Sequence, residues 1–235
     1  MVRLGLSLFA GLLLVAPSAV LSAANEVVYL AGAAEIDGLA GARFSSILTV
    51  SNPNAAAVAV RVEFVPPPGV AVPSPLLRTL AAGQTWRVDR VLPALFGLAS
   101  TAGALRLTSE NSVVTTLATR NVADPRGTYG VALPPVAEST LLGAGEVGHG
   151  IWLSQSAVNG RGYRSNLAVV FSEAGEVELR ILDALGVNRG SRVLSAERPA
   201  FVQLRLADLI GDVDFEGRYE IAVRTGRVLS YGVVN

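Results

Sequence analysis

The chain has 235 residues, 51% of them hydrophobic, with 24 Gly, 12 Pro and no Cys. Its 19 basic residues, all of them Arg, balance 19 acidic residues, so the formal net charge is zero. Without Cys the chain has no disulfide, thiolate metal site or cysteine nucleophile. A neutral chain also lacks the basic footprint of a nucleic-acid-binding protein. We therefore expect no nucleic-acid partner.

The N-terminal residues have the pattern of a cleavable signal peptide. Arg3 gives a positive start, Leu4 to Val15 is an apolar run, and Ser22 to Ala24 supplies small residues for signal peptidase. This run is shorter than the roughly 20 apolar residues that span a bilayer. We predict a signal peptide at residues 1–24, export to the periplasm, cell surface or medium, and no integral membrane segment after cleavage.

The rest of the chain contains an internal repeat. Residues 44–50 (FSSILTV) resemble residues 163–169 (YRSNLAV) at an offset of 119 (163 − 44), and Leu80 to Asn121 matches Leu194 to Asn235 at an offset of 114 (194 − 80). The difference of five places five extra residues of the first copy between Leu48 and Leu80, where loops tolerate insertion. We predict two units, residues 25–121 and 149–235, joined by a connecting segment, residues 122–148.

Both copies alternate apolar and polar residues with a period of two, as in Val60 to Phe64 and Val177 to Ile181. This alternation is typical of antiparallel strands with one face buried. The helical candidates are single turns at Leu92 to Phe96 and Leu206 to Ile210, each before a Gly. The pattern predicts an all-β protein made of two tandem antiparallel β-sandwich domains after the signal peptide.

These motifs carry a family resemblance. The stretch from Phe44 to Pro53, followed by Leu80 to Gly83 and Gly103 to Leu107, resembles a family of uncharacterised exported bacterial proteins. The resemblance implies tandem immunoglobulin-like β-sandwich units and export. The chain departs from the pattern at Ser45 and Ile47, where an Arg and a polar residue are expected, as Arg164 and Asn166 provide in the second copy. The family supplies no catalytic residue to transfer.

No motif predicts a catalytic residue or a cofactor. The only histidine, His149, lies between two glycines, and the chain has no Gly-x-Ser-x-Gly turn for a hydrolase nucleophile. Residues 143–148 match the Gly-x-Gly-x-x-Gly pattern, but a dinucleotide site needs a helix after it and a strand is expected here. We expect a flexible connection at this place.

The weak metal candidate is an acidic loop formed by Asp212, Asp214 and Glu216. Carboxylate oxygens suit calcium, but the twelve-residue calcium loop requires a bidentate Glu where Val223 stands. The corresponding loop of the first copy, Leu98 to Ala102, has no acidic residue. A solvated loop is therefore favoured and no metal is predicted.

Two other features have a functional and a structural interpretation. The segment from Pro66 to Pro75 is either a polyproline ligand or a stiff hairpin loop, and the loop is favoured. A set of aromatic residues would form a platform for sugar rings, but their strand patterns favour burial in the core. These are Tyr29, Phe44, Trp86, Trp152 and Tyr163.

The sequence thus favours an exported, non-enzymatic interaction or structural module. Its expected partner is a protein or glycan of the cell envelope. Two alternatives stay open: a carbohydrate-binding accessory protein, and a glycan hydrolase that uses a pair of carboxylates.

Overall fold

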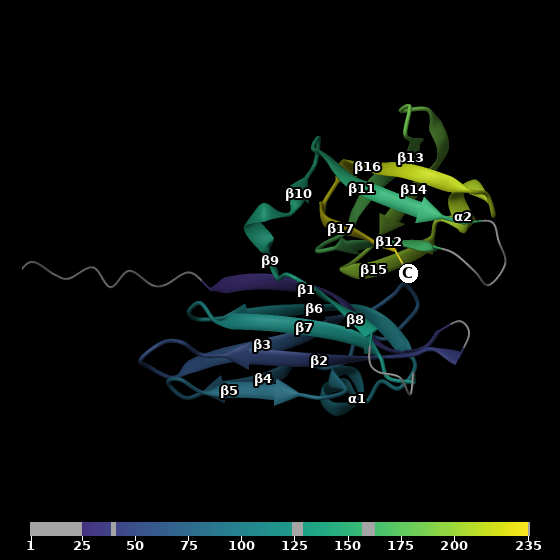
Figure 1. The fold of residues 1–235 in the computed structure, drawn as a ribbon. Helices are drawn as coiled ribbons and strands as arrows, with labels where there is room; N and C mark the ends of the chain where they lie inside the picture. The colour runs from purple at the N-terminus through teal and green to yellow at the C-terminus, as the bar shows by residue number, and fades with distance from the viewer. Residues whose placement is uncertain (1–24, 39–40, 124–128, 157–162, 235) are drawn as a thin grey trace, which may run out of the picture.

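The computed structural model describes residues 25–38, 41–123, 129–156 and 163–234. The predicted signal peptide and Asn235 lie outside these residues. The described chain consists mainly of antiparallel strands, so the predicted all-β class is confirmed (Figure 1). The first strand set contains β1 (Glu26–Asp37), β2 (Arg43–Ser51), β3 (Val58–Val65), β4 (Leu76–Leu80), β5 (Thr85–Val88), β6 (Thr101–Ser109) and β7 (Val114–Asn121). The second strand set contains β11 (Val147–Gln155), β12 (Ser165–Phe171), β13 (Gly175–Asp183), β14 (Asn188–Ala196), β15 (Ala200–Arg205), β16 (Phe215–Thr225) and β17 (Arg227–Val234).

Alternation of side chains builds a separate core in each set. In β3, Val60, Val62 and Phe64 are buried while Arg61 is exposed, and in β13 Val177 and its alternate neighbours are buried in the same way. A strand with this alternation places one face on the core and the other in solvent. The first core lies among β1 to β7, and the second lies between two four-stranded sheets.

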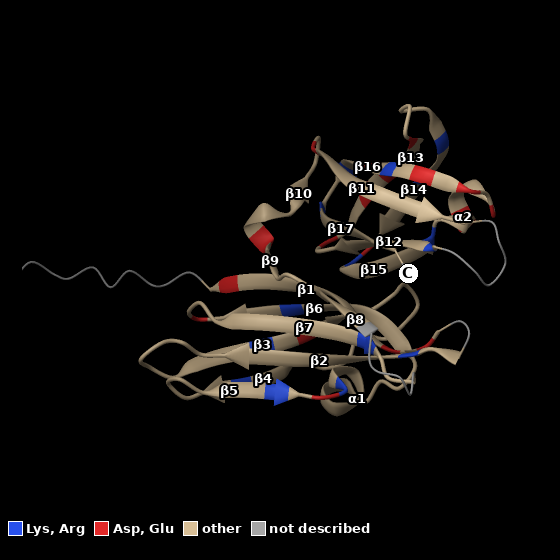
Figure 2. Cartoon of the chain, viewed as in Figure 1, with Lys and Arg blue, Asp and Glu red and all other residues tan. Residues whose placement is uncertain are grey.

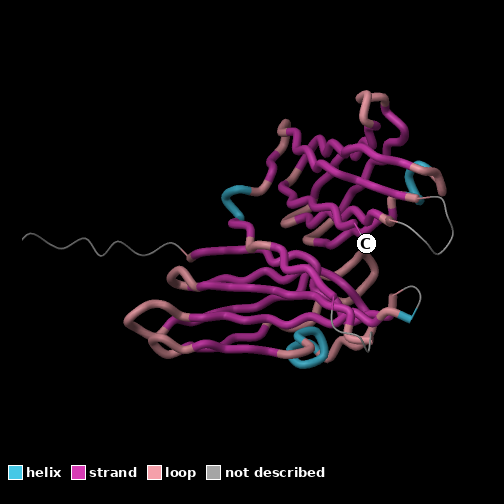
Figure 3. The backbone as a smooth tube through the Cα atoms, viewed as in Figure 1, coloured by secondary structure: helices cyan, strands magenta, loops and turns pink. Residues whose placement is uncertain are grey.

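The strand pairings of the first set recur in the second. β1 pairs with β6, β6 with β3, and β3 with β4, as β11 pairs with β16, β16 with β13, and β13 with β14. On the other side, β2 pairs with β7 and β5, as β12 pairs with β17 and β15. The short helices α1 (Val91–Phe96) and α2 (Ala207–Ile210) occupy the same place in both sets and confirm the predicted helical turns (Figure 3).

The residues between the two sets also form strands. β8 (Tyr129–Leu133) pairs with β7, β9 (Val136–Ala137) pairs with β1, and β10 (Leu142–Gly143) pairs with β17. A 3-10 helix, Glu138–Thr140, lies between β9 and β10. Residues 143–148 run from β10 through a turn into β11, so a strand follows the glycine pattern, as expected. The expected connecting segment is therefore held by both sets.

A third apolar cluster joins the two sets. From the first set come Tyr29, Ala31, Val65 and Ala104, and from the second Ala168, Val170 and Phe201, with Leu141 between them. The middle of β1 and the whole of β12 carry no charged residue, and the middle of β1 is tan in Figure 2. A strand that is buried on both faces has such an uninterrupted apolar run.

The proline-rich loop closes one side of this junction. The Phe201 N–H, on the edge strand β15, donates to the Pro66 carbonyl at 2.9 Å. The Arg198 guanidinium donates to the Val70 carbonyl, also at 2.9 Å. The connection between β3 and β4 spans residues 66–75, whereas the one between β13 and β14 spans residues 184–187. Additional residues of the first copy thus lie in a loop that contacts the second strand set.

Candidate functional site

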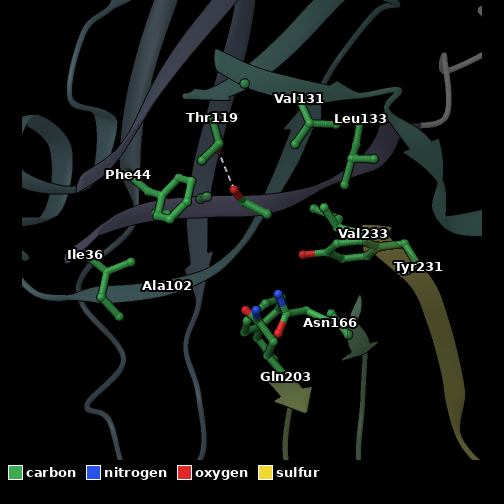
Figure 4. Close-up of a pocket in the computed structure, with 18 of the residues that line it drawn as sticks. Ile36, Phe44, Ala102, Thr119, Val131, Leu133, Asn166, Gln203, Tyr231 and Val233 are labelled. Atoms are coloured by element: carbon green, nitrogen blue, oxygen red, sulfur yellow. Dashed lines mark hydrogen bonds between the residues drawn. The ribbon is translucent and has the colours of Figure 1, made fainter. Parts of the chain in front are cut away.

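A groove of about 770 Å³ lies at this junction (Figure 4). Its walls come from β1, β7 and β8 of the first half of the chain and from β12, β15 and β17 of the second. Val131 and Leu133 of β8 lie on one side, and Tyr231 and Val233 of β17 lie on the other. Ligand sites commonly lie in clefts between packed units, which makes this groove the first candidate.

Several uncharged polar groups point into the apolar groove. Asn166, Gln203 and the Tyr231 phenol come from the second strand set. Thr119 comes from β7, and its hydroxyl donates to the Gly32 carbonyl at 2.6 Å. Burial raises the pKa of Tyr231 above its ordinary value, so the phenol stays protonated and able to donate at neutral pH.

The lining of the groove contains no Asp, Glu, Arg or His among the described residues. General acid–base chemistry at neutral pH needs a group that gains and loses a proton near that pH. The Tyr231 phenol does not meet this condition because its pKa is raised. This surface is suited to holding an uncharged or apolar ligand by contact and amide hydrogen bonds.

A second hollow, of about 570 Å³, lies beside the predicted acidic loop. Asp214 and Glu216 line it together with Asp183, while Asp212 is exposed nearby. Among the described residues, no three His, Asp or Glu side chains are grouped closely enough to hold a metal ion. The structure therefore does not bring Asp212, Asp214 and Glu216 together as a ligand set.

Asp183 has a structural task in this second hollow. Its carboxylate accepts hydrogen bonds from the Val187 and Leu185 N–H groups, both at 2.9 Å, and pairs with Arg189. The backbone hydrogen bond from Val187, with the contributions of Arg189 and Leu185, lowers the pKa of Asp183 despite desolvation. A glycosidase acid needs a raised pKa, so Asp183 is unsuited to that role.

The aromatic residues fall into two groups, and the prediction that all are buried is wrong for one of them. Tyr29 is fully buried, Trp86 is buried under Arg78 at 4.6 Å from the ring centroid, and Phe44 is half-buried at the groove. Trp152 and Tyr163, however, are 81% and 63% exposed. Strand alternation fails at Trp152 because this residue lies in a β-bulge, where the order of inward and outward residues changes.

The bulge occurs at the same place in both strand sets. In β1, Leu30 and Ala33 are opposite Leu105 and Gly103 of β6, so Ala31 and Gly32 face a single residue. In β11, Gly150 and Leu153 are opposite Tyr219 and Gly217 of β16, so Ile151 and Trp152 do the same. By this pairing, Ala31 is equivalent to Ile151, and Gly32 is equivalent to Trp152.

The backbone at the bulge is left-handed in both sets, with φ of +79° at Gly32 and 63° at Trp152. Glycine adopts this conformation readily, whereas a large L-residue is strained in it by about 1–2 kcal/mol. Ile151, the neighbour of Trp152, is also exposed, at 82%. An exposed apolar pair held in a strained conformation is a second candidate for a binding surface.

His149, the only histidine of the chain, lies in β11 opposite Glu220. Its side chain is exposed. Comparison of the chain with family models, curated proteins and solved structures found no match. No helix in the described part of the chain is both long enough and apolar enough to cross a membrane.

Proposed function

We propose that this protein is a non-enzymatic binding module that acts through its surface, with the groove at the junction as its main ligand site. We further propose that each strand set is an immunoglobulin-like β-sandwich and that the protein is exported. The N-terminal sequence supports export, and the recurrence of the same five pairings supports the tandem architecture.

One observation carries the binding function: the described residues that line the groove offer apolar, amide and hydroxyl groups and no charged side chain. Apolar walls with a few placed polar groups are typical of ligand-binding sites. The position at the contact between two strand sets adds a fixed shape, because the third apolar cluster packs beneath it. The expected ligand is an uncharged or apolar group of an envelope protein or glycan.

A pair of valines, Val131 on β8 and Val114 on β7, tests this function. Val131 lines the groove and is 41% exposed, whereas Val114 is 60% exposed and lies outside it. We would screen the protein against a displayed peptide library and a glycan array, and titrate the binders found. Val131→Trp fills the groove and is expected to lower the affinity for these ligands at least tenfold. Val114→Trp is expected to leave the affinity within about twofold of the wild-type value. Binders that respond equally to both substitutions, or no binder at all, would contradict the groove function.

Glycan binding through aromatic stacking is the second candidate, and the exposure of Trp152 favours it. A carboxylate-based glycan hydrolase has less support. No acidic residue is among the described residues that line the groove. In the second hollow, the Asp183 carboxylate is occupied by backbone N–H groups of its turn and by Arg189.

A further inference from the structure

The two strand sets differ at one sheet edge. In the first set β8 covers β7, with Leu117 opposite Leu133, Thr119 opposite Val131 and Asn121 opposite Tyr129. In the second set the equivalent strand is β17, and β10 pairs with it only at Arg227 and Val228. Among the described residues, no strand pairs with that edge of β17 from Leu229 to Val234.

The equivalent positions follow from the pairing of the neighbouring strands. Ser46 and Ser165 both accept a hydrogen bond from the backbone two residues after the bulge, Ala34 N–H in one set and Ser154 N–H in the other. Leu48 and Leu167 lie two residues further on, and they pair with Leu117 and Gly232. Gly232 is therefore the counterpart of Leu117, the β7 residue opposite Leu133.

The backbone of β17 has hydrogen-bonding groups available at this edge. The Ser172 N–H donates to the Arg227 carbonyl, so Arg227 and the alternate residues after it direct their backbone groups toward β12. Ser230, Gly232 and Val234 direct theirs toward the open edge by the same alternation. In β7 the corresponding register is fixed by the hydrogen bond from Val122 N–H to the Arg43 carbonyl, and its outward residues pair with β8.

Trp152 lies where a strand on this edge would place a side chain. In the first set, a Cβ on Gly32 would lie 3.6 Å from Leu133 Cδ1 of β8, so this bulge position faces the added strand. Trp152 is the counterpart of Gly32 and is 81% exposed because β17 has no such neighbour in the described chain. The indole is thus in position to cover the residue opposite Gly232.

We propose that the open edge of β17, flanked by Trp152, binds an extended segment of a partner polypeptide as an added antiparallel strand. The strand that occupies the equivalent edge of β7, Tyr129–Leu133 with sequence YGVAL, indicates a segment with alternating aliphatic side chains. Main-chain hydrogen bonds supply affinity in such strand addition, and alternate side chains supply specificity. A second copy is a less suitable donor because its own β8 is already paired with β7. The edge borders the groove, whose lining includes Gly232 and Val234, but the proposal does not require the groove to bind a ligand.

The test uses a fluorescent peptide with the sequence of residues 128–134, TYGVALP, titrated with the protein and followed by anisotropy. In β8, the backbone N–H and C=O groups of Tyr129, Val131 and Leu133 face the neighbouring strand β7. A peptide N-methylated at the Val131 and Leu133 positions is expected to bind at least tenfold more weakly. The matched peptide, N-methylated at the Gly130 and Ala132 positions, is expected to stay within about threefold, because those amides face outward.

A pair of protein variants tests the flanking side chain. Trp152→Ala is expected to lower the affinity for the peptide at least fivefold. The control, Leu185→Ala, changes a residue that is 88% exposed in a distant turn and is expected to leave the affinity unchanged. Trp152 does not line the groove, so Trp152→Ala is also titrated with the ligands found for the groove. Loss of the peptide with those ligands unchanged separates this site from the groove, and equal loss of both would contradict a separate edge site.

Three results would overturn the proposal. The first is absence of peptide binding, or equal loss with both N-methylation patterns. The second is binding of a neutral glycan, lost in Trp152→Ala, that competes with the peptide. The third is self-association in sedimentation experiments that is abolished by the peptide, since the edge would then take a second copy.

Discussion

The left-handed bulge residue shows how one backbone position is used in two ways. At Gly32 the absence of a side chain lets β17 of the second set approach, because a Cβ there would lie 3.3 Å from the Tyr231 hydroxyl. At Trp152 the same conformation presents a large ring to solvent. The first position serves the contact between the strand sets, and the second costs strain that packing does not offset.

We predict opposite stability changes for substitutions at these two positions. Gly32→Ala adds a strained Cβ beside Tyr231 and is expected to lower the free energy of unfolding by about 1–2 kcal/mol. Trp152→Gly removes backbone strain with little loss of buried surface. Its free energy of unfolding should be unchanged or higher by up to about 1 kcal/mol. Urea denaturation measures both, and a destabilised Trp152→Gly would show that the indole stabilises the fold.

At the level of elements, one buried carboxylate ties three of them together. The Glu35 side chain, at the end of β1, is 2% exposed. It accepts hydrogen bonds from Ser45 of β2 and from Arg90, which precedes α1, both at 2.8 Å. Arg43 also lies 3.5 Å away. Arg90 has a left-handed backbone with φ of 52°, so this ion pair also holds a strained residue.

The pH dependence of stability follows from this arrangement. Burial alone would raise the pKa of Glu35, but the hydrogen bonds from Arg90 and Ser45 and the nearby positive charges outweigh it and lower the pKa. A lowered folded-state pKa gives stability that is full above the unfolded value of about 4.3 and is lost as pH falls through the folded value.

Glu35→Gln tests this contribution. The variant is expected to be less stable at pH 7 by about 1–3 kcal/mol, because Arg90 and Arg43 lose their charged partner. Its stability should fall less steeply than that of the wild type between pH 5 and about pH 3. Urea midpoints over this range measure the effect, with the exposed Glu173→Gln as control. Parallel curves for Glu35→Gln and wild type would contradict the role of Glu35.

At the level of the whole molecule, the junction makes one body of the two strand sets. Phe201 is 2% exposed although it lies on the outer face of β15. The corresponding strand of the first set, β5, carries the exposed Thr85 and Arg87 on its outer face. The second set has thus exchanged a solvated face for an apolar one that covers β1.

Phe201→Arg is expected to separate the sets without unfolding them, because it restores the kind of residue that β5 carries. Calorimetry should show two thermal transitions in place of one, and X-ray scattering should show a larger radius of gyration. Circular dichroism should keep its strand signal. The control, Thr85→Arg, changes an exposed residue and should leave a single transition. A single transition in Phe201→Arg at unchanged temperature would contradict a stabilising junction.

Much of the fold was predictable because it follows from alternation. The period of two located β3, β13 and the core strands, and the repeat located the helical turns. The junction was not predicted, although its signal was present as the uninterrupted apolar runs of β1 and β12. Alternation indicates which residues are inward, but it does not say that a second protein surface covers the outward ones.

The candidate sites were less predictable than the fold. The groove joins residues that lie about a hundred positions apart in sequence, such as Val131 and Tyr231, and only the packing of the sets brings them together. In sequence, residues 28–30 (VYL) resemble residues 151–153 (IWL) at an offset of 123 (151 − 28). The pairing instead matches Leu30 with Gly150, an offset of 120 (150 − 30), so the sequence likeness is three residues out of register. With the register of the pairing, Trp152 would have fallen on Gly32 and its exposure could have been inferred.

The sheet that contains β17 is asymmetric, and this limits how it can grow. Its other edge, β15, is closed at Phe201 by the Pro66 carbonyl and at Arg205 by the Asp208 carboxylate, which accepts its N–H at 3.2 Å. A fibril requires strands to add at both edges of every sheet. A sheet that is blocked at one edge can pair with another copy only at its remaining free edge. Self-association through β17 therefore ends at a pair of copies, because neither copy has a second free edge on this sheet from which a longer assembly could grow.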